Sequence, residues 1–184
     1  MAASTTASPP DPMHPPAPRL TGLPPVVDAR TRLLVLGSFP GAASLAAGQY
    51  YAHPQNAFWK IIAATWLGGD ALALRHASYA ERLDCLLRHG LGLWDVYDSC
   101  EREGSLDAAI RQPQPNDLLR LREACPNLQA VGHNGGESYR HARYSARLGV
   151  PVHRLPSTSP ANASWRFERK LAAWQDVFRL HGLI

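Results

Sequence analysis

The tightest constraint on the fold is an apolar run that ends at a turn rich in glycine and proline. Residues 33–36 are Leu, Leu, Val and Leu, and residues 37–41 follow with the sequence GSFPG. A short apolar run with such a boundary is typical of a strand buried on both faces, as in a parallel sheet covered by helices. In such sheets ligands bind beyond the carboxyl ends of the strands. The sequence therefore predicts an α/β fold with a binding crevice near residues 37–41.

Apolar stretches alternate with segments of helical periodicity along the rest of the chain. Strands are predicted at residues 91–96, 128–131 and 150–155, and helices at residues 56–67, 79–89, 117–124, 137–148 and 165–181. This alternation predicts a three-layer α/β/α sandwich with a central four-stranded parallel sheet. Residues 150–155 are expected at its edge, because Pro151 lacks the N–H that an inner strand needs. Residues 98–115 are expected to be mostly loop.

The loops that follow the predicted strands should meet, since the carboxyl ends of parallel strands lie at one edge of a sheet. They comprise residues 37–56, 94–98, 132–136 and 155–162. Tyr51, His53 and Asn56 bring an aromatic face, an imidazole and an amide to this edge, which suits the binding of a flat heterocycle. Structural roles stay open for three residues: His53 as a loop brace, Asn134 in a left-handed turn, and Asp95 as a brace between loops.

Composition limits the class of protein. Residues 1–28 are rich in Ala, Ser, Thr and Pro, so we expect a disordered or polyproline-like tail before one folded domain over residues 29–184. The net charge of +4 is compatible with a polyanionic partner but does not require one. Three scattered cysteines fit reduced thiols in the cytoplasm and predict no metal or iron–sulfur site. We see neither a secretory signal nor an apolar run of the ~20 residues that cross a bilayer, so no membrane partner is expected.

Five segments resemble, in order, the motifs of the uracil-DNA glycosylase superfamily. They are residues 37–41 (GSFPG), 51–60 (YAHPQNAFWK), 92–96 (GLWDV), 133–135 (HNG) and 155–160 (LPSTSP). Within that superfamily the chain is most similar to the hypoxanthine-DNA (deoxyinosine) glycosylases, which are related to the mismatch-specific uracil-DNA glycosylases. The resemblance runs from about residue 31 to the C-terminus. Its most specific part is the HPxNxFW block after a GxxPG turn.

The resemblance implies an enzyme that flips a deaminated base, most of all hypoxanthine, out of DNA and hydrolyses its bond to deoxyribose. It assigns catalysis to Asn56 and Asn134 and base stacking to Tyr51. Many members of the superfamily carry a water-handling Asp or Asn where this chain has Phe39. A phenyl ring cannot orient water, so that mechanism does not transfer, and the deoxyinosine branch is likewise apolar here.

The chemistry of these residue types agrees with the implied roles. The side-chain carbonyl of Asn56 can hold a water near the sugar, and the amide of Asn134 can donate to the departing base. The backbone N–H groups of Ser38 and Phe39 are candidate donors to the base, and His53 is a further candidate for base contact. Amides do not titrate, so we expect a flat pH profile near neutrality, which a catalytic carboxylate would contradict; Asp95 and Asp98 are the candidates.

Strand cleavage through a Schiff base would need an amine nucleophile. The chain has two lysines, Lys60 and Lys170, both in predicted helices away from the loop tips. We therefore expect a monofunctional enzyme without a cofactor.

The predicted partner is DNA containing deaminated bases, bound by a monomer. Contacts to the phosphates are expected from small hydroxyls in the last loop and from basic side chains near it: Ser157, Thr158, Ser159, Arg140 and Arg154. Three alternatives remain open. The enzyme could remove uracil from mismatches, the chain could be a non-catalytic module for damaged or single-stranded nucleic acid, or it could hydrolyse free nucleosides.

Overall fold

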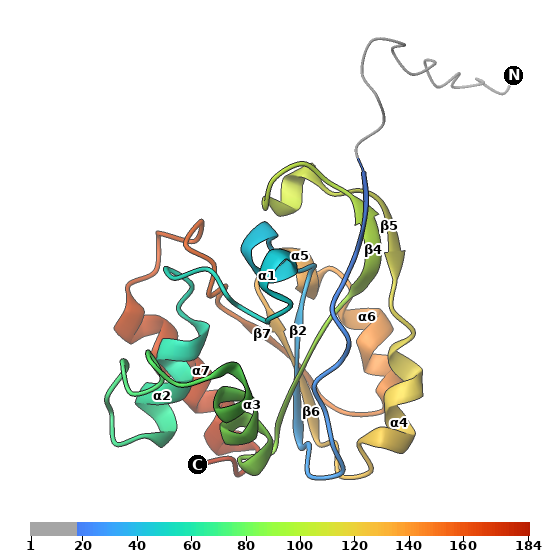
Figure 1. Cartoon of the computed structure of the whole chain (residues 1–184). Helices are drawn as coiled ribbons and strands as arrows, with labels where there is room; N and C mark the ends of the chain where they lie inside the picture. Colours follow the sequence, from blue (N-terminus) through green and yellow to red (C-terminus); the bar gives the residue numbers. More distant parts are fainter. Residues whose placement is uncertain (1–17) are drawn as a thin grey trace, which may run out of the picture.

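The structure, a computed structural model, describes residues 18–184 and contains the predicted parallel sheet (Figure 1). The strand order is β3-β2-β6-β7, and every neighbouring pair is parallel. The strands are β2 (Leu33–Gly37), β3 (Leu91–Asp95), β6 (Ala130–Asn134) and β7 (Val152–Leu155). β7 lies at the edge, as the proline before it predicted.

Helices cover both faces of this sheet, which confirms the three-layer α/β/α sandwich (Figure 1). Alternate residues of β2 face opposite layers, since Leu33 and Val35 belong to one buried cluster and Leu34 and Leu36 to the other. The first cluster includes side chains of α2 (Phe58–Trp66), α3 (Tyr79–Arg88) and α7 (Phe167–Leu180). The second is covered by η2 (Leu118–Arg120), α4 (Leu121–Ala124), α6 (Ala142–Ser145) and η3 (Ala146–Leu148).

The predicted helix over residues 137–148 is interrupted. It consists of α5 (Gly136–Tyr139), α6 and η3, with a break at His141, whose φ of −96° and ψ of 14° lie outside the helical range. The break accompanies a tertiary contact, because the Nε2 atom of His141 lies 2.8 Å from the hydroxyl oxygen of Tyr97. Periodicity alone does not carry that information.

The expectation of a loop over residues 98–115 was wrong. β4 (Tyr97–Glu101) and β5 (Arg111–Pro115) form an antiparallel hairpin with two register shifts, and η1 (Asp107–Ala109) lies in the segment that connects them. The side chains of β5 are all exposed and include two prolines, so they show no alternation that a sequence pattern could detect. The hairpin stands above the edge of the parallel sheet where its strands end (Figure 1).

The expected tail over residues 1–28 was wrong for its last part. β1 (Arg19–Thr21) pairs with β4, and Val26 and Leu93 exchange backbone hydrogen bonds of 2.8 and 2.9 Å. These bonds to the rest of the domain offset the cost of ordering a segment whose composition is typical of disorder. Residues 1–17 lie outside the described residues. Within residues 18–184, no helix combines the length and apolarity that crossing a bilayer requires.

Candidate active site

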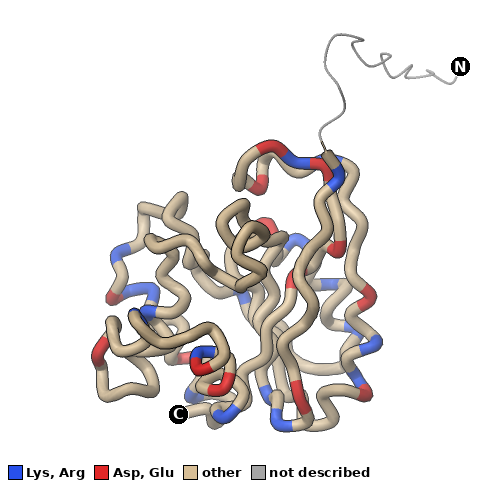
Figure 2. The backbone as a smooth tube through the Cα atoms, in the orientation of Figure 1, with Lys and Arg blue, Asp and Glu red and all other residues tan. Residues whose placement is uncertain are grey.

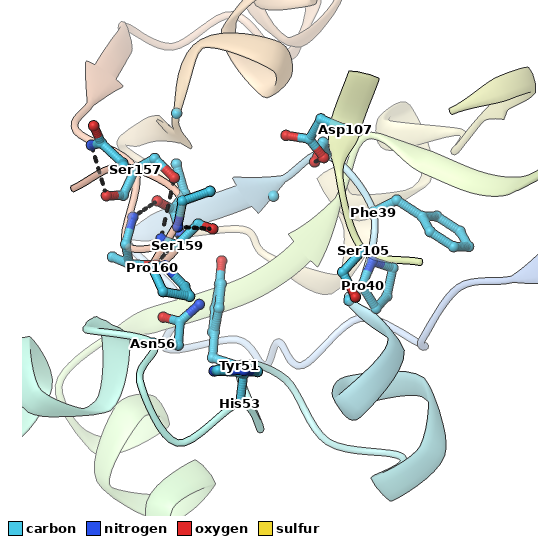
Figure 3. Close-up of a pocket in the computed structure, with 18 of the residues that line it drawn as sticks. Phe39, Pro40, Tyr51, His53, Asn56, Ser105, Asp107, Ser157, Ser159 and Pro160 are labelled. Atoms are coloured by element: carbon cyan, nitrogen blue, oxygen red, sulfur yellow. Dashed lines mark hydrogen bonds between the residues drawn. The ribbon is translucent and has the colours of Figure 1, made fainter. Parts of the chain in front are cut away.

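The loops at the carboxyl edge of the sheet surround a cavity of about 1050 Å³ (Figure 3). As predicted, its lining draws on the segment after β2, on Asp95, on the segment after β6 and on the segment after β7. A further segment was not predicted: residues 105–108, from the β4–β5 hairpin, line the same cavity. The short helix α1 (Ala42–Ala47), which follows the 37–41 turn, contributes Ala43 and Ser44.

The 37–41 turn divides its side chains between the cavity and the core. Ser38 donates a hydrogen bond of 2.6 Å from Oγ to Oδ1 of Asp107, which ties the turn to the hairpin. The ring of Phe39 points away from the site (Figure 3) and packs in the second buried cluster. The guanidinium of Arg102 lies 5.0 Å from the centre of that ring and donates to the carbonyl of Pro40. Phe39 can therefore serve a ligand only through its backbone.

Tyr51 points into the cavity (Figure 3). Its ring stacks on Phe58 at 4.1 Å between centroids and 23° between planes, and its backbone φ is +54°. A left-handed φ is unusual for an aromatic residue and is commonest at functional sites. The preceding Tyr50 instead packs in the core and donates its hydroxyl to the carbonyls of Leu23 and Pro24.

Asn56 lies beside Tyr51, at the start of α2 (Figure 3). Its Oδ1 accepts a hydrogen bond of 2.9 Å from the backbone N–H of Phe58, so the amide also begins the helix. A carbonyl oxygen has two lone pairs, which leaves one for a water. His53 is exposed and accepts a bond of 3.2 Å at Nδ1 from the N–H of Gln55. The bracing role of His53 is thus present in the structure, and its imidazole lines the cavity as well.

Asn134 and Thr158 form a clasp between β6 and the loop after β7. Nδ2 of Asn134 donates to Oγ1 of Thr158 at 2.9 Å, and Oδ1 of Asn134 accepts from the N–H of Thr158 at 2.9 Å. The carbonyl of Thr158 accepts from the N–H of Ala57 at 2.9 Å, so three loops meet at this residue. Because Thr158 is 1% exposed, the direct phosphate contact that we expected of its hydroxyl does not fit this structure. The second N–H of the Asn134 amide lies near the hydroxyl of Tyr51, whose pKa burial raises and Asn134 lowers, and is the one that a ligand can share.

Of the other predicted DNA contacts, Ser157, Ser159 and Arg154 line the cavity and Arg140 does not. Ser157 and Ser159 are partly exposed, and their Oγ atoms accept from N–H groups two residues further on, at 3.2 Å each. Arg154 is exposed, lines the cavity and stands 5.8 Å from the ring centre of Tyr139. Arg140 pairs with Glu137 at 3.2 Å and does not line the cavity. Figure 2 shows Lys and Arg interspersed with Asp and Glu over the chain, rather than gathered on one face in this view.

Two carboxyl groups line the cavity. Asp95 was predicted at this edge of the sheet, either as a brace between loops or as a contact to the substrate, whereas Asp107 was not predicted there, because it lies in the segment interpreted as loop. Asp95 is 4% exposed, and its pKa is raised to about 8, mainly by burial and also by the charge of Asp107, against a lowering by Arg102. Burial also raises the pKa of Asp107, whereas the bond from Ser38 lowers it. For Asp95 the sequence offered a signal, because an acidic residue follows the apolar residues of segment 92–96. The sequence offered no signal for Asp107, because only the pairing of the hairpin brings this residue to the cavity.

Lys170, in α7, contacts the loop after β7 but does not line the cavity. Its side chain is buried, and Nζ donates a bond of 2.9 Å to the carbonyl of Asn162 in the loop after β7. Neither Lys170 nor Lys60 lines the cavity, so the described residues bring no lysine amine to it.

Comparisons with known proteins agree with this geometry. The family model of the uracil DNA glycosylase superfamily matches residues 24–178. A hypoxanthine DNA glycosylase of Methanosarcina barkeri is 37% identical over 158 residues, which cover 86% of this chain and 97% of that protein. One of Methanosarcina acetivorans is 34% identical over 160 residues, again 86% of this chain and 97% of that protein.

A solved structure is also similar. It is a solution NMR structure of a protein from Methanosarcina acetivorans described as a candidate uracil DNA glycosylase. It aligns with a TM-score of 0.77 at 33% identity and covers 89% of this chain and 99% of its own. With a family model over most of the domain, two relatives above 30% identity and a shared fold, the chain belongs to the uracil DNA glycosylase superfamily.

Proposed function

We propose that this protein is a DNA glycosylase that removes deaminated bases from DNA, with hypoxanthine as its main substrate. The observation that carries the proposal is the meeting of Asn56, Asn134 and Tyr51 in one cavity, although they come from separate motifs. Two amides and a fixed aromatic face fit a neutral, flat base. The names of the two curated relatives, both hypoxanthine DNA glycosylases, support the choice of base.

The proposed reaction is hydrolysis of the bond between C1′ of deoxyribose and N9 of hypoxanthine. The bond breaks with its electron pair moving to the base, which leaves positive charge on the sugar. The oxygen of a water then adds to C1′ and loses one proton, while the base takes up one proton. Fixed dipoles lower such a barrier when they point at the developing charges. The free lone pair of Asn56 Oδ1 suits the water and the cationic sugar, and the free N–H of Asn134 suits the departing base.

The base must leave the duplex to reach this cavity, at a cost of a few kcal/mol that is smallest for mispaired bases. Tyr51 offers it a surface whose tilt is set by the stack on Phe58. Arg154, Ser157 and Ser159 at the mouth suit phosphate oxygens, so binding should weaken steeply as salt rises. Because no lysine lines the cavity, the product is an abasic site in an intact strand.

Duplex oligonucleotides with a single inosine, uracil or xanthine test the proposal, with abasic sites converted to breaks by alkali. Inosine should be released fastest, and Asn56→Ala should lower that rate by ~10²–10³-fold while sparing DNA binding. Asn127→Ala is the matched control, since Asn127 is exposed and bonds the carbonyl of Ala29 outside the cavity.

Each alternative has its own signature in the same assay. Release of uracil from mismatches faster than release of hypoxanthine would make uracil the main substrate. Binding without release of any base would leave a non-catalytic damage-binding module, and salt-insensitive hydrolysis of free nucleosides would favour a nucleoside hydrolase. Borohydride trapping of a protein–DNA adduct would contradict the monofunctional mechanism. A monomer acting in the cytoplasm stays a prediction, and sedimentation of the purified protein tests the first part.

A further inference from the structure

Two polar atoms in the wall of the cavity have no hydrogen-bond partner among the described residues. They are Oδ2 of Asp95 and the hydroxyl oxygen of Tyr51, and both are buried. Buried polar groups are nearly always hydrogen-bonded, and exceptions call for an explanation. Two such atoms in the lining of one cavity indicate a site where polar atoms of a ligand supply the missing hydrogen-bond partners. We define Asp95 and Tyr51 as the cavity floor.

The floor depends on a glycine at position 37. A Cβ atom on Gly37 would lie 2.3 Å from Oδ1 of Asp95 and 3.7 Å from the hydroxyl of Tyr51. Real Cβ atoms essentially never come as close as the first distance. The carboxyl of Asp95 therefore occupies the space that a side chain at position 37 would take, directly beneath the turn that opens the cavity.

The surroundings of Asp95 favour its neutral form. The charged and titratable groups that face it are Asp107, Arg102, Tyr50 and Tyr51. No ion pair in the described part of the chain involves Asp95. Arg102 donates from Nη2 to the carbonyl of Pro40 and packs on the ring of Phe39, while its Nε and Nη1 have no partner among the described residues. Burial raises the pKa of Asp95 to about 8, so at neutral pH its carboxyl carries an O–H donor beside a C=O acceptor.

We propose that the protonated carboxyl of Asp95 donates a hydrogen bond to the flipped base and stabilises the negative charge that develops on it as the glycosidic bond breaks. This inference rests on the proposed function. Hypoxanthine offers carbonyl and ring-nitrogen acceptors to such a donor, and the hydroxyl of Tyr51 adds a second polar contact. A carboxylic acid kept neutral in an apolar site is an effective donor to a developing anion. An ionised Asp95 would instead repel the departing base, so only enzyme with a protonated Asp95 should be active.

Single-turnover release of hypoxanthine from inosine DNA tests this inference across a range of pH. The wild-type rate should fall ~10-fold per pH unit above the pKa of about 8. Asp95→Asn keeps a donor and an acceptor in the same shape, so its rate at neutral pH should stay within ~10-fold of wild type and lose this fall with pH. Asp95→Ala should lose ~10²–10³-fold. Asp98→Asn, at an exposed carboxyl, is the matched control and should behave as wild type.

A second measurement does not depend on turnover. Free hypoxanthine, the product base, should bind to wild type at least ~10-fold more tightly at neutral pH than to Asp95→Ala, or than to wild type well above the pKa of Asp95. Tyr51→Phe keeps the stacked ring and removes the hydroxyl alone, so it should weaken the same binding by a smaller factor. Near-ultraviolet circular dichroism verifies that each variant is folded.

The outcomes separate the two proposals. Wild-type enzyme that releases no hypoxanthine contradicts the proposed function, and unchanged binding of the free base by Asp95→Ala then overturns the role of Asp95 independently. Active wild type with an equally active Asp95→Ala overturns the role of Asp95 alone. A wild-type rate that rises as pH passes 8 would assign the ionised carboxylate, and so would also overturn it.

Discussion

The clasp and the cavity floor lie at the same edge of the sheet, but they differ in whether their polar atoms have hydrogen-bond partners. In the clasp, the amide of Asn134 uses both its oxygen and its nitrogen on Thr158. In the floor, Asp95 and Tyr51 each keep a buried oxygen that has no partner within residues 18–184. Satisfied polar clusters fix the structure around them, whereas unsatisfied ones store a cost that a ligand can relieve. The comparison distinguishes polar atoms whose bonds hold the loops together from polar atoms left for a ligand.

The two clusters should also have opposite effects on stability. Removing a clasp residue leaves its partner without a hydrogen bond, which costs about 1–3 kcal/mol per buried group. Replacing the carboxyl of Asp95 by an amide removes the free-energy cost of burying a group that would ionise in water, and that cost is already present in the folded protein. Binding sites commonly show this trade of stability for function.

The largest expected effect comes from breaking the clasp with Asn134→Ala. This change leaves the N–H and the hydroxyl of Thr158 without their partners and removes the free amide N–H that faces the base. We expect a loss of about 2–3 kcal/mol in the free energy of unfolding and of ~10²–10³-fold in the rate of base release. Urea denaturation and single-turnover kinetics measure the two losses.

Thr158→Val distinguishes bracing from catalysis at the clasp. It removes only the hydroxyl that accepts from Asn134 and keeps the backbone N–H bond to Oδ1. If Asn134 contacts the base, Thr158→Val should lose at most ~10-fold in rate, well short of Asn134→Ala. Equal losses in both variants would make Asn134 a positioning residue.

The next largest effect should come from closing the floor with Gly37→Ala. The added Cβ overlaps Oδ1 of Asp95, so the carboxyl must move, at a cost of about 1–3 kcal/mol in stability. Base release should fall with it. In an Asp95→Ala background the overlapping atom is gone, so the same change at Gly37 should cost much less. A double-mutant cycle measures this coupling, and additive effects would show that the contact does not matter.

A smaller effect of opposite sign is expected from Asp95→Asn. The pKa of Asp95 is about 8 in the folded protein, against about 3.9 in an unfolded chain. The folded state therefore holds the proton more tightly, and its stability falls as pH rises from about 4 to about 8. The amide that replaces the carboxyl cannot ionise in either state, so the variant escapes this fall.

Thermal unfolding across pH measures that difference. The Tm of Asp95→Asn should exceed that of wild type by an amount that grows between about pH 4 and pH 8 and then levels off. Asp98→Asn should show no such trend, because Asp98 is exposed. A constant difference, or a lower Tm for the variant, would place the carboxyl in a polar environment and remove the contrast with the clasp.

The clasp and the floor also differ in how far the sequence predicted them. Asn134 follows an apolar strand and belongs to a family motif, so its position in the cavity was predictable. Its partner was not: Thr158 was expected to contact phosphate, because a hydroxyl in a loop looks the same whether it faces solvent or a neighbouring loop. The sheet itself was predictable, since hydrophobic periodicity and the Gly and Pro residues that end strands and helices are local properties of the sequence.

The properties of the cavity floor could not be predicted from any local sequence pattern. Asp95 ends a predicted strand, but its raised pKa depends first on burial in the folded protein and then on Asp107, which the hairpin brings near it; Arg102, from the same hairpin, lowers that pKa. That hairpin has exposed, proline-containing β5, and its pairing is a tertiary effect. The flat pH profile was expected from two amides, with Asp95 named as a carboxyl that could contradict it; the raised pKa of Asp95 could not be predicted, because it depends on the folded structure.

The smallest effect should come from Arg154, which belongs to neither cluster and so tests whether the contrast is confined to the interior. Arg154→Gln removes an exposed cation at the mouth of the cavity, so the slope of log affinity against log salt should fall by about 1. Affinity at low salt should fall a few-fold, while the single-turnover rate at saturating enzyme and the Tm should hardly change. Arg140→Gln is the matched control: Arg140 lies outside the cavity lining and is paired with Glu137, so it should alter the slope less. A lower Tm or saturating rate in Arg154→Gln would instead mean that this cation helps to hold the loops, as the clasp does.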